Sequence, residues 1–450
     1  MYHLGWVATR HLGRAGIAKM YEHLVITNPK RRSSAVSGRD EWYPFYAGFS
    51  GVFARELIGS FVTSGRLTLM DPWNGSGTST AAAALYGHRA LGFDLNPVMA
   101  VVAKARLLPR TDLPSVAPLL SDIGKKMPGC RCAAADGDPL LTWFAPDAAA
   151  SIRAIDTAIH TLLVSAVAVG STIDSASKMS AIAAFFYVAL FRAVQRLLAR
   201  FKSSNPTWIR RPDCAQWRLM PSAVDIRSSF TSQVSEMSTA IEAEPNEWDL
   251  AGADCTIEVA SSERLPVPDG NIDVVLSSPP YCTRIDYGVA TSPELAVLGL
   301  GMAEQLRQLR GVLIGTPTIR GGSYAPDPAW GTTCNAFLER VLRHPSKAAK
   351  SYYYKTYVQY FAAISRSISE ISRCIKRGGT CIIVAQDSYF KDVRADLATM
   401  FGEIAFEWGL VLSRKVDFTM SRTLATINTK SRGYRPISPA VESVLCFTKN

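Results

Sequence analysis

The chain has 450 residues, of which 48% are hydrophobic and 19% are charged. This length and apolar content are enough for two or three domains with buried cores, so a disordered or fibrous protein is excluded. Lys and Arg together outnumber Asp and Glu by 49 to 38, an excess of eleven positive charges. Such an excess favours a polyanionic partner, most simply a nucleic acid.

The nine cysteines are scattered, and the closest pair, Cys130 and Cys132, lacks the spacing of a zinc site. The six histidines show no metal-binding spacing either. We therefore expect a cytoplasmic protein with reduced thiols and no metal. The most apolar stretch, residues 181–190, is followed by three arginines and is shorter than the roughly 20 residues that a bilayer requires. It predicts a buried helix and no membrane contact.

Two parts of the chain alternate strand and helix patterns. In the first, residues 66–70 (RLTLM) end at the turn DPWNGSGTST, a small-residue segment follows, and residues 89–95 (RALGFDL) resume as a strand. In the second, residues 271–278 (NIDVVLSS) form a strand of the fully buried type, and residues 378–388 repeat a glycine turn with a β-branched run. These patterns predict an α/β fold with a mostly parallel sheet.

The stretch between these two parts shows a different sequence pattern. Residues 109–248 show mainly helical periodicity and end in a basic, aromatic segment, RFKSSNPTWIRRPDCAQWR. We expect an inserted, mostly helical target-recognition region, in which Arg210 and Arg211 contact nucleic acid. A loop insertion is expected near 310–350, where Arg320 in the run IRGGS is a further expected contact. The expected organisation is 1–108, 109–248 and 249–450.

The turn after Met70 has the composition of a cofactor-binding loop. Gly75 and Gly77 allow a tight turn and a close approach of a ligand to the backbone. Asp94 ends the next strand, where an acid can accept hydrogen bonds from both hydroxyls of a ribose. A third glycine on the dinucleotide spacing is absent, and Asp71 would repel a pyrophosphate but attract an ammonium group. The expected ligand therefore carries an amine, as S-adenosylmethionine does.

A second motif, Ser278, Pro279, Pro280 and Tyr281, follows the buried strand at the edge where open α/β sheets place their active sites. The prolines stiffen the turn and have no N–H, so the turn offers acceptors, the Ser278 hydroxyl and the Pro279 carbonyl. These acceptors suit a planar substrate with an exocyclic amine, and Tyr281 would stack on it. Hydrogen bonds from the amine to these acceptors favour a pyramidal nitrogen that can attack a sulfonium methyl. No strong base is needed, because the methylated amine is acidic.

Three motifs, DPWNGSGTS, GFDLN and SSPPY, resemble motifs I, II and IV of the S-adenosylmethionine-dependent DNA amino-methyltransferases, which methylate cytosine N4 or adenine N6. The resemblance covers roughly residues 40–105 and 250–450. It implies a Rossmann-like, seven-stranded, mostly parallel methyltransferase sheet with a largely helical insertion between the cofactor and catalytic motifs. It also implies double-stranded DNA as the partner and a bacterial or phage-borne enzyme of restriction or phage defence. A cognate restriction or defence protein is a further implied partner.

The resemblance also implies roles for individual residues. It assigns the methionine moiety of the cofactor to Asp71, Gly75 and Gly77, the ribose to Asp94 and the adenine amine to Asp254. Asn74, in the same turn, is a further expected cofactor contact. The segment before motif I resembles motif X, which implies that Phe45 and Phe49 pack on the methionine end, although core packing explains these two rings equally well. Residues expected to line the channel of the target base are Arg284, Asp286 and Tyr287. The family usually has Phe-Cys where this chain has Trp73-Asn74.

The first residue of the SSPPY turn indicates which amine is methylated. Family members with Asp or Asn there commonly act on adenine N6, and those with Ser commonly act on cytosine N4. Ser278 thus favours N4-methylcytosine, with the base rotated out of the duplex, and adenine N6 stays open. An RNA methyltransferase and a non-catalytic DNA-binding subunit also stay open. Methylation at cytosine C5 is excluded, because it needs a Pro-Cys nucleophile and the sequence has none.

Overall fold

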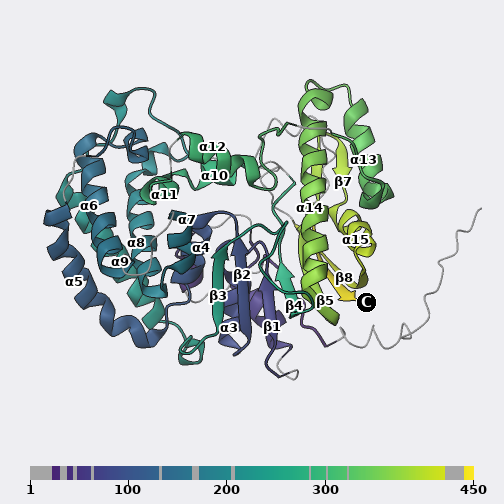
Figure 1. Cartoon of the computed structure of the whole chain (residues 1–450), viewed down its shortest axis with the longest axis horizontal. Helices are drawn as coiled ribbons and strands as arrows, with labels where there is room; N and C mark the ends of the chain where they lie inside the picture. The colour runs from purple at the N-terminus through teal and green to yellow at the C-terminus, as the bar shows by residue number, and fades with distance from the viewer. Residues whose placement is uncertain are drawn as a thin grey trace, which may run out of the picture.

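A seven-stranded sheet forms the centre of the protein (Figure 1). From one edge to the other its strands are β3 (Cys255–Val259), β2 (Arg89–Asp94), β1 (Thr68–Asp71), β4 (Ile272–Ser277), β5 (Ile375–Gln386), β9 (Ala440–Lys449) and β8 (Leu410–Met420). The strand pairs from β3 to β5 are parallel, and β9 is antiparallel to both of its neighbours. This order, with β9 reversed, is that of the Rossmann-like methyltransferase fold. The predicted fold class is therefore confirmed.

The computed structural model describes most of the chain, and all structural statements below concern these residues. They are residues 23–30, 38–43, 48–61, 65–130, 134–164, 172–203, 208–282, 285–300, 303–321, 324–420 and 440–450. None of the helices within these ranges is both long and apolar enough to cross a membrane.

Helices cover both faces of the sheet, which explains why the central strands are apolar on both sides. On one face, α2 (Gly51–Gly59) and α3 (Thr78–Leu85) pack against side chains of β1, β4, β5 and β9. On the other face lie α13 (Thr332–Arg343), α14 (Tyr354–Cys374) and α15 (Leu397–Glu407). A small hairpin of β6 (Ser388–Phe390) and β7 (Val393–Ala395) packs on α13.

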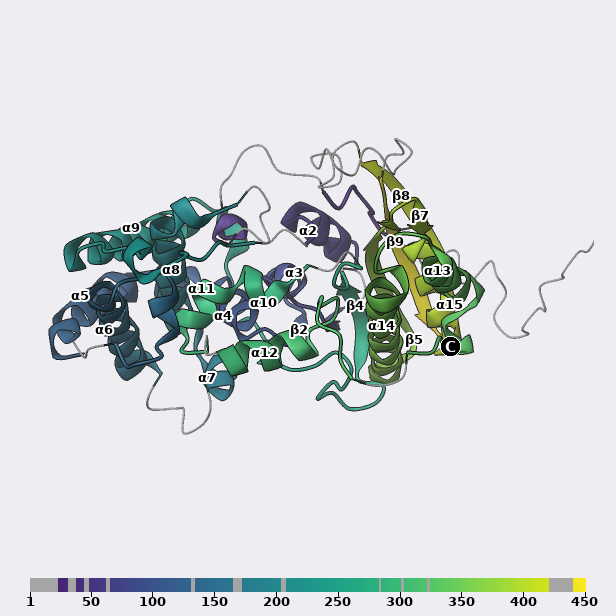
Figure 2. The same cartoon turned by 90° about the horizontal axis from the view of Figure 1, so that it is seen from above.

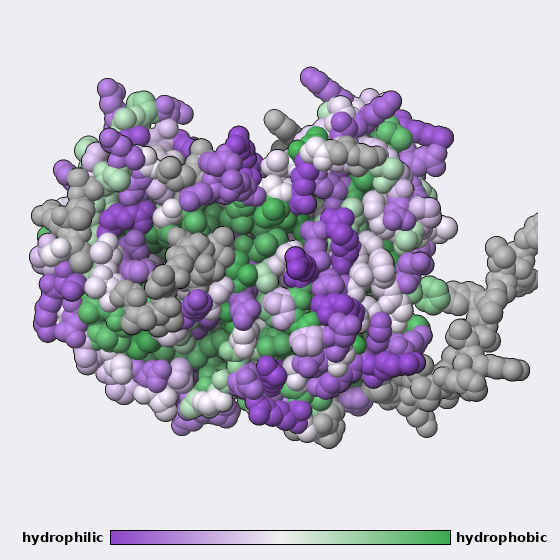
Figure 3. All heavy atoms as spheres, viewed as in Figure 1, coloured by the Kyte–Doolittle hydropathy of each residue, from purple (hydrophilic) through white to green (hydrophobic). Residues whose placement is uncertain are grey.

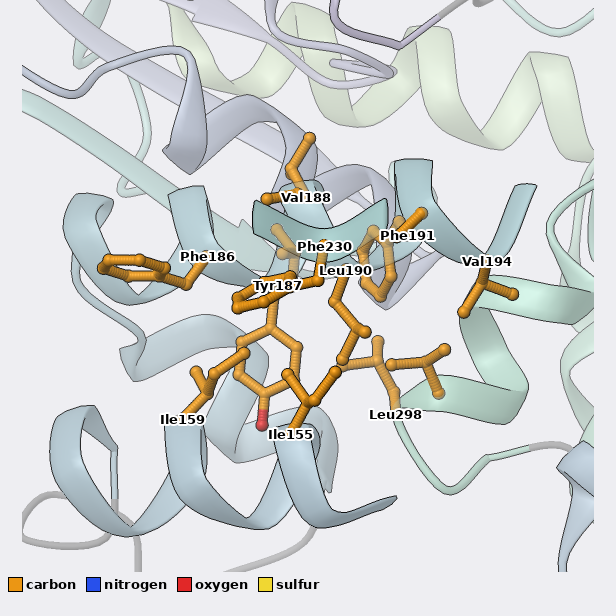
Figure 4. Close-up of a cluster of buried hydrophobic side chains, with 14 of the residues drawn as sticks. Ile155, Ile159, Phe186, Tyr187, Val188, Leu190, Phe191, Val194, Phe230 and Leu298 are labelled. Carbon is orange, nitrogen blue, oxygen red and sulfur yellow. The ribbon is translucent and has the colours of Figure 1, made fainter. Parts of the chain in front are cut away.

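Residues 109–248 contain helices and no strand wherever the structure describes them. The helices are α5 (Val116–Lys126), α6 (Pro146–Leu163), α7 (Thr172–Lys178), α8 (Ala181–Leu197) and α9 (Ala223–Glu242). The apolar stretch at the start of α8 is the predicted buried helix, because every residue from 183 to 191 is at most 2% exposed. In Figure 4, side chains of α8 lie among Ile155 and Ile159 of α6 and Phe230 of α9.

The helical region shares its core with the sheet domain. Two short elements connect them, α4 (Pro97–Ala105) after β2 and α11 (Ser292–Val297) after β4. Both helices belong to the same hydrophobic cluster as α5, α6, α8 and α9. Figure 2 shows these helices gathered at one end of the molecule, with α4 and α11 between them and the sheet. The helical region is thus packed directly beside the part of the sheet that carries the cofactor motif.

The stretch near 310–350 is only partly the loop that the sequence predicts. The helix α12 (Ala303–Val312) ends inside it, and α13 occupies its second half. Cys334, Phe337 and Val341 of α13 are buried against α14 and α15. Their spacing of three and four residues places them on one helix face. The Gly and Pro residues of the preceding segment led to the prediction of a loop over the whole stretch, so this amphipathic pattern was missed.

Candidate active site: a cavity at the carboxyl edge of the sheet

A cavity of about 690 Å³ lies at the carboxyl edge of the sheet, between the strand ends and the helical region. Its first wall, the sheet wall, consists of residues that end or follow strands: Pro72, Trp73, Asp94 to Asn96, Ala260, Ser262 and Ser278 to Pro280. Its second wall, the helical wall, consists of residues from α8, α9 and α11 together with Lys202, Ser203, Trp208 and Ile209. Pockets for small molecules have about this size. Figure 3 shows the molecular surface hollowed between the helical lobe and the lobe of α13 and α14, with hydrophobic residues in the hollow.

Asp71 ends β1 and holds the first turn together. Its carboxylate accepts hydrogen bonds from the hydroxyls of Ser79 (2.5 Å) and Ser277 and from the N–H of Trp73 (3.1 Å). Burial raises the pKa of this carboxyl to about 6, although the three bonds oppose that shift. Asp71 is not among the described residues of the cavity wall. Its predicted contact with an ammonium group stays a prediction.

Gly77 explains why the turn needs a glycine. It precedes α3 with a φ of 82°, in the left-handed region that side chains disfavour. A Cβ built on Gly77 would lie 2.8 Å from the Cβ of Ala103, so this glycine lets α3 and α4 pack closely. Asn74 and Gly75 are buried and, like Gly77, are not among the described residues of the cavity wall. The predicted cofactor contacts of these three residues are not tested by this arrangement.

Asp94 lines the cavity at the end of β2, where the sequence predicts a ribose-binding acid. Backbone N–H groups of Gly75 (2.9 Å) and Asn96 (2.8 Å) each donate to one of its carboxylate oxygens. These bonds orient the carboxylate, and each oxygen keeps a lone pair for a ligand. Burial raises the pKa of Asp94 to about 6. The turn after Met70 thus contributes to the cavity by positioning Asp94 through the backbone N–H of Gly75.

Ser278, Pro279 and Pro280 line the same cavity directly after β4. The Tyr360 hydroxyl of α14 donates to the carbonyl of Pro280 (2.9 Å), which fixes the turn against the sheet domain. The motif at the end of β2 and the motif at the end of β4 therefore meet in one cavity, although about 180 residues separate them in the sequence.

The side chain of Tyr281 does not point into this cavity. Its hydroxyl accepts a hydrogen bond from the ammonium of Lys30 (3.2 Å), which lies 6.0 Å from the centroid of its ring. Lys30 also forms an ion pair with the buried carboxylate of Glu442 (3.5 Å). Tyr281 does not belong to the described wall of the cavity. Stacking of a target base on this ring stays a prediction.

The three residues expected in the base channel differ in position. Tyr287 lines the cavity, and its hydroxyl accepts from the N–H of Tyr281 (3.3 Å). Asp286 is buried outside the described wall, where it caps α10 (Tyr287–Ala290) and pairs with Arg310 (2.6 Å). The prediction for Asp286 is therefore wrong, since its carboxylate is used within the protein. Arg284 lies outside the described residues.

The prediction that Asp254 holds the adenine amine is also wrong. Asp254 precedes β3 and so lies at the amino edge of the sheet, where it pairs with Arg66 (2.7 Å). The cavity opens at the opposite edge. The residues that follow β3, among them Ala260 and Ser262, line the cavity instead. The sequence alone does not give the exact bounds of a short strand. An acid that precedes such a strand can therefore be mistaken for one that ends it.

The other predicted residues lie away from the cavity. Phe49 packs edge-on against Phe53 in the core beneath α2, with ring centroids 5.3 Å apart, so core packing accounts for it. Phe45 falls outside the described residues. Arg210 and Arg211 are exposed and directly follow Ile209 of the cavity wall. The remaining predicted contact, Arg320, is half-buried. Nucleic-acid contacts of these arginines stay predictions.

The sequence analysis missed most of the helical wall. Its polar and aromatic side chains are Arg192, Gln195, Arg196, Lys202, Trp208, Gln233 and Glu294. They come from separate segments, so no local motif marks them. Lys202 and Trp208 lie in the basic, aromatic segment noted above, which was the one available signal. Among the described residues, no group of three or more His, Cys, Asp or Glu side chains is placed to hold a metal ion.

No protein-family model and no curated protein matches this sequence. Among solved structures, the similar ones include two of the rRNA methyltransferase aviRa from Streptomyces viridochromogenes. One has 10% identity over 93% of this chain and 94% of that chain, with a TM-score of 0.29. The other has 10% identity over 94% and 91%, with a TM-score of 0.25. Likeness this low carries no argument about activity or substrate, and the fold class rests on the strand order.

Proposed function

We propose that this protein transfers a methyl group from S-adenosylmethionine to the exocyclic amine of a base rotated out of double-stranded DNA, with cytosine N4 as the favoured target. The observation that carries the proposal is the meeting of Asp94 and the Ser278–Pro280 turn in one cavity. The first offers charged acceptors for a ribose, and the second offers neutral acceptors for an amine. Neither feature alone would support the reaction.

The cavity wall has the chemistry that the cofactor needs. The two oxygens of Asp94, held by backbone N–H groups, would accept from the two ribose hydroxyls. Leu95 and Met99 line the cavity beside Asp94 and offer an apolar surface for a planar adenine ring. When bound, the cofactor supplies a methyl group on a positively charged sulfur. The cavity of about 690 Å³ is of the size that accommodates such a ligand.

The Ser278–Pro280 turn would orient the amine of the base. The Ser278 hydroxyl and the Pro279 carbonyl can each accept one N–H, and the bond from Tyr360 keeps the turn rigid. An amine held in this way directs its lone pair out of the ring plane. The methylated nitrogen is acidic, so its proton can leave to a hydroxyl or to water without a strong base.

Two features support DNA as the substrate. A base within a duplex cannot enter a cavity at the edge of a sheet, so it must rotate out of the stack. The cavity wall carries two exposed basic side chains, Lys202 and Arg196, and Arg196 also pairs with Glu236 (2.8 Å). The net charge of +11 further favours a phosphate backbone as the partner. A cognate restriction or defence protein remains a prediction from the resemblance.

The test is incubation with labelled S-adenosylmethionine and unmethylated genomic DNA, followed by mass spectrometry of the nucleosides. We expect N4-methylcytosine. N6-methyladenine alone would overturn the choice of base, and label in an RNA pool but not in DNA would overturn the choice of nucleic acid. Absence of both cofactor binding and methyl transfer would overturn the proposal. Asp94→Ala should strongly lower transfer at cofactor concentrations that just saturate the wild-type protein, and Asp254→Ala, at the other edge of the sheet, is the matched control.

A further inference from the structure

The helical wall contains a buried acid, Glu294 of α11, with one unsatisfied oxygen. The side chain lines the cavity and is 0% exposed to solvent. Its Oε1 accepts hydrogen bonds from the Tyr43 hydroxyl (3.0 Å) and from the side-chain amide of Gln195 (2.8 Å). Its Oε2 is buried and has no hydrogen-bond partner among the described residues. Tyr43 and Gln195 thereby orient the carboxyl and leave Oε2 as the atom available to a ligand.

This arrangement is costly unless a ligand completes it. A buried polar atom without a partner destabilises the folded protein, and a buried charge does so more strongly. Burial accordingly raises the pKa of Glu294 to about 7, against the opposing effects of Gln195, of its own backbone N–H, of Tyr43 and of the charge of Lys202. A glutamine or an apolar side chain would avoid this cost. A perturbed acid in the wall of a cavity is more typical of a binding or catalytic site than of a structural core.

The place of Glu294 in the fold associates it with the substrate rather than with the ribose. Asp94, at the end of β2, already supplies the acid for the ribose. Glu294 lies in the segment that follows the Ser278–Pro280 turn, one helical turn beyond Thr291. The Thr291 hydroxyl accepts from the side-chain amide of Asn96 (2.9 Å), so α11 is anchored next to the cofactor motif. Glu294 therefore belongs to the helical wall of the same cavity that the Ser278–Pro280 turn lines.

We propose that Glu294 Oε2 binds the target base by accepting one of the two hydrogens of its exocyclic amine, in place of the neutral Ser278 hydroxyl, while the Pro279 carbonyl accepts the other. This inference rests on the proposed function and adds a charged acceptor that the Ser278–Pro280 turn lacks. Hydrogen bonds to a carboxylate are stronger than those to a neutral hydroxyl. The same negative charge would stabilise the positive charge that develops on the nitrogen during methylation. Glu294 would thus recognise bases that carry an amine and reject those that carry none.

The test compares two DNA duplexes that differ by one amine. One has a mismatched cytosine, which leaves the stack at low cost, and the other has pyrimidin-2-one at that position. Binding is measured by fluorescence anisotropy at about pH 8.5, where a carboxyl with a pKa of about 7 is ionised. For the wild-type protein we expect the cytosine duplex to bind at least about tenfold more tightly.

The decisive variant is Glu294→Gln. Tyr43 and Gln195 both donate to the position of Oε1, so the amide oxygen of the variant must occupy that position. Its NH₂ group then takes the position of Oε2, so the amine of the target base meets a hydrogen-bond donor instead of an acceptor. We expect the tenfold preference to fall below about threefold while S-adenosylmethionine affinity stays unchanged. Glu242→Gln, an exposed acid on α9, is the matched control and should keep the full preference.

Tyr43→Phe provides a second variant should Glu294→Gln impair folding. It removes one donor to Oε1, loosens the carboxyl and should lower the preference by a smaller factor. An unchanged preference in folded Glu294→Gln, or no preference in the wild-type protein, would overturn the inference. Methyl transfer by the same wild-type preparation reports separately on the proposed function. Transfer with an unchanged preference in the variant leaves that function standing and the inference refuted.

Discussion

The two walls of the cavity are built in different ways. The sheet wall consists of residues within a few positions of a strand end, and its acid, Asp94, is held by backbone N–H groups. The helical wall combines residues from distant segments, and its acid, Glu294, is held by the side chains of Tyr43 and Gln195. Backbone donors persist when neighbouring side chains change. Under the proposed function, the cofactor side of the cavity would therefore depend on turn geometry and the substrate side on side-chain identity.

The largest effect should come from breaking the geometry of the sheet wall with Gly77→Ala. The new Cβ meets Ala103 and forces a left-handed φ on a non-glycine residue, so we expect a loss of about 2–5 kcal/mol of unfolding free energy. Gly87→Ala is the matched control, because Gly87 has a φ of 73° but no atom within 4 Å of a new Cβ. Urea denaturation measures both. Equal losses would show that contact with α4 does not matter.

Asp94→Ala should weaken S-adenosylmethionine binding by about 1.5–3 kcal/mol, because charge-assisted hydrogen bonds to the ribose are lost. Isothermal titration calorimetry measures the affinity. Asp254→Ala should bind the cofactor as the wild-type protein does, since Asp254 lies at the amino edge of the sheet. Unchanged affinity in a folded Asp94→Ala protein would remove the sheet wall from the cofactor site.

Glu294 of the helical wall should make the stability of the folded protein depend on pH. The folded-state pKa of Glu294, about 7, lies above the ordinary value for a glutamate, so the folded protein retains a proton that the unfolded chain releases. Its contribution to stability is therefore largest at acid pH and declines as the pH rises toward 7. Glu294→Gln should remove this decline. The free energy of unfolding of the variant, relative to that of the wild-type protein, should therefore rise by on the order of 2 kcal/mol as the pH increases from about 5 to about 8. Denaturation curves at several pH values give this difference, and a pH-independent difference would contradict the assignment.

The smallest effect is expected at the rim of the helical wall. Neutralising Arg210 and Arg211 together should lower the slope of log K against log salt for DNA binding by about two units, roughly one for each lost phosphate contact. Neutralising Lys125 and Lys126, exposed on α5, removes the same charge elsewhere in the helical region. If both pairs change the slope equally, Arg210 and Arg211 have no special role in binding.

The sequence by itself determined the parts of the sheet wall that follow β1, β2 and β4, but not Ala260 and Ser262, which follow β3. The segments DPWNGSGTS, GFDLN and SSPPY each place a strand end and its turn within a few residues, so backbone geometry and near neighbours decide their shape. Since the carboxyl ends of parallel strands share one edge, their meeting in a single cavity also followed from the fold class. The mostly parallel sheet and the buried helix at residues 181–190 came from the same local patterns, whereas the expected number of strands came from the family resemblance.

Only the tertiary structure decided the rest. It placed Asp254 at the amino edge, turned Asp286 toward Arg310, and brought Lys30 to Tyr281 across 251 positions of sequence. It likewise assembled Glu294 with Tyr43 and Gln195, which are 251 and 99 positions away. Contacts between such distant residues depend on how helices pack on one another, and hydrophobic periodicity specifies which face of a helix is buried but not which neighbour it meets.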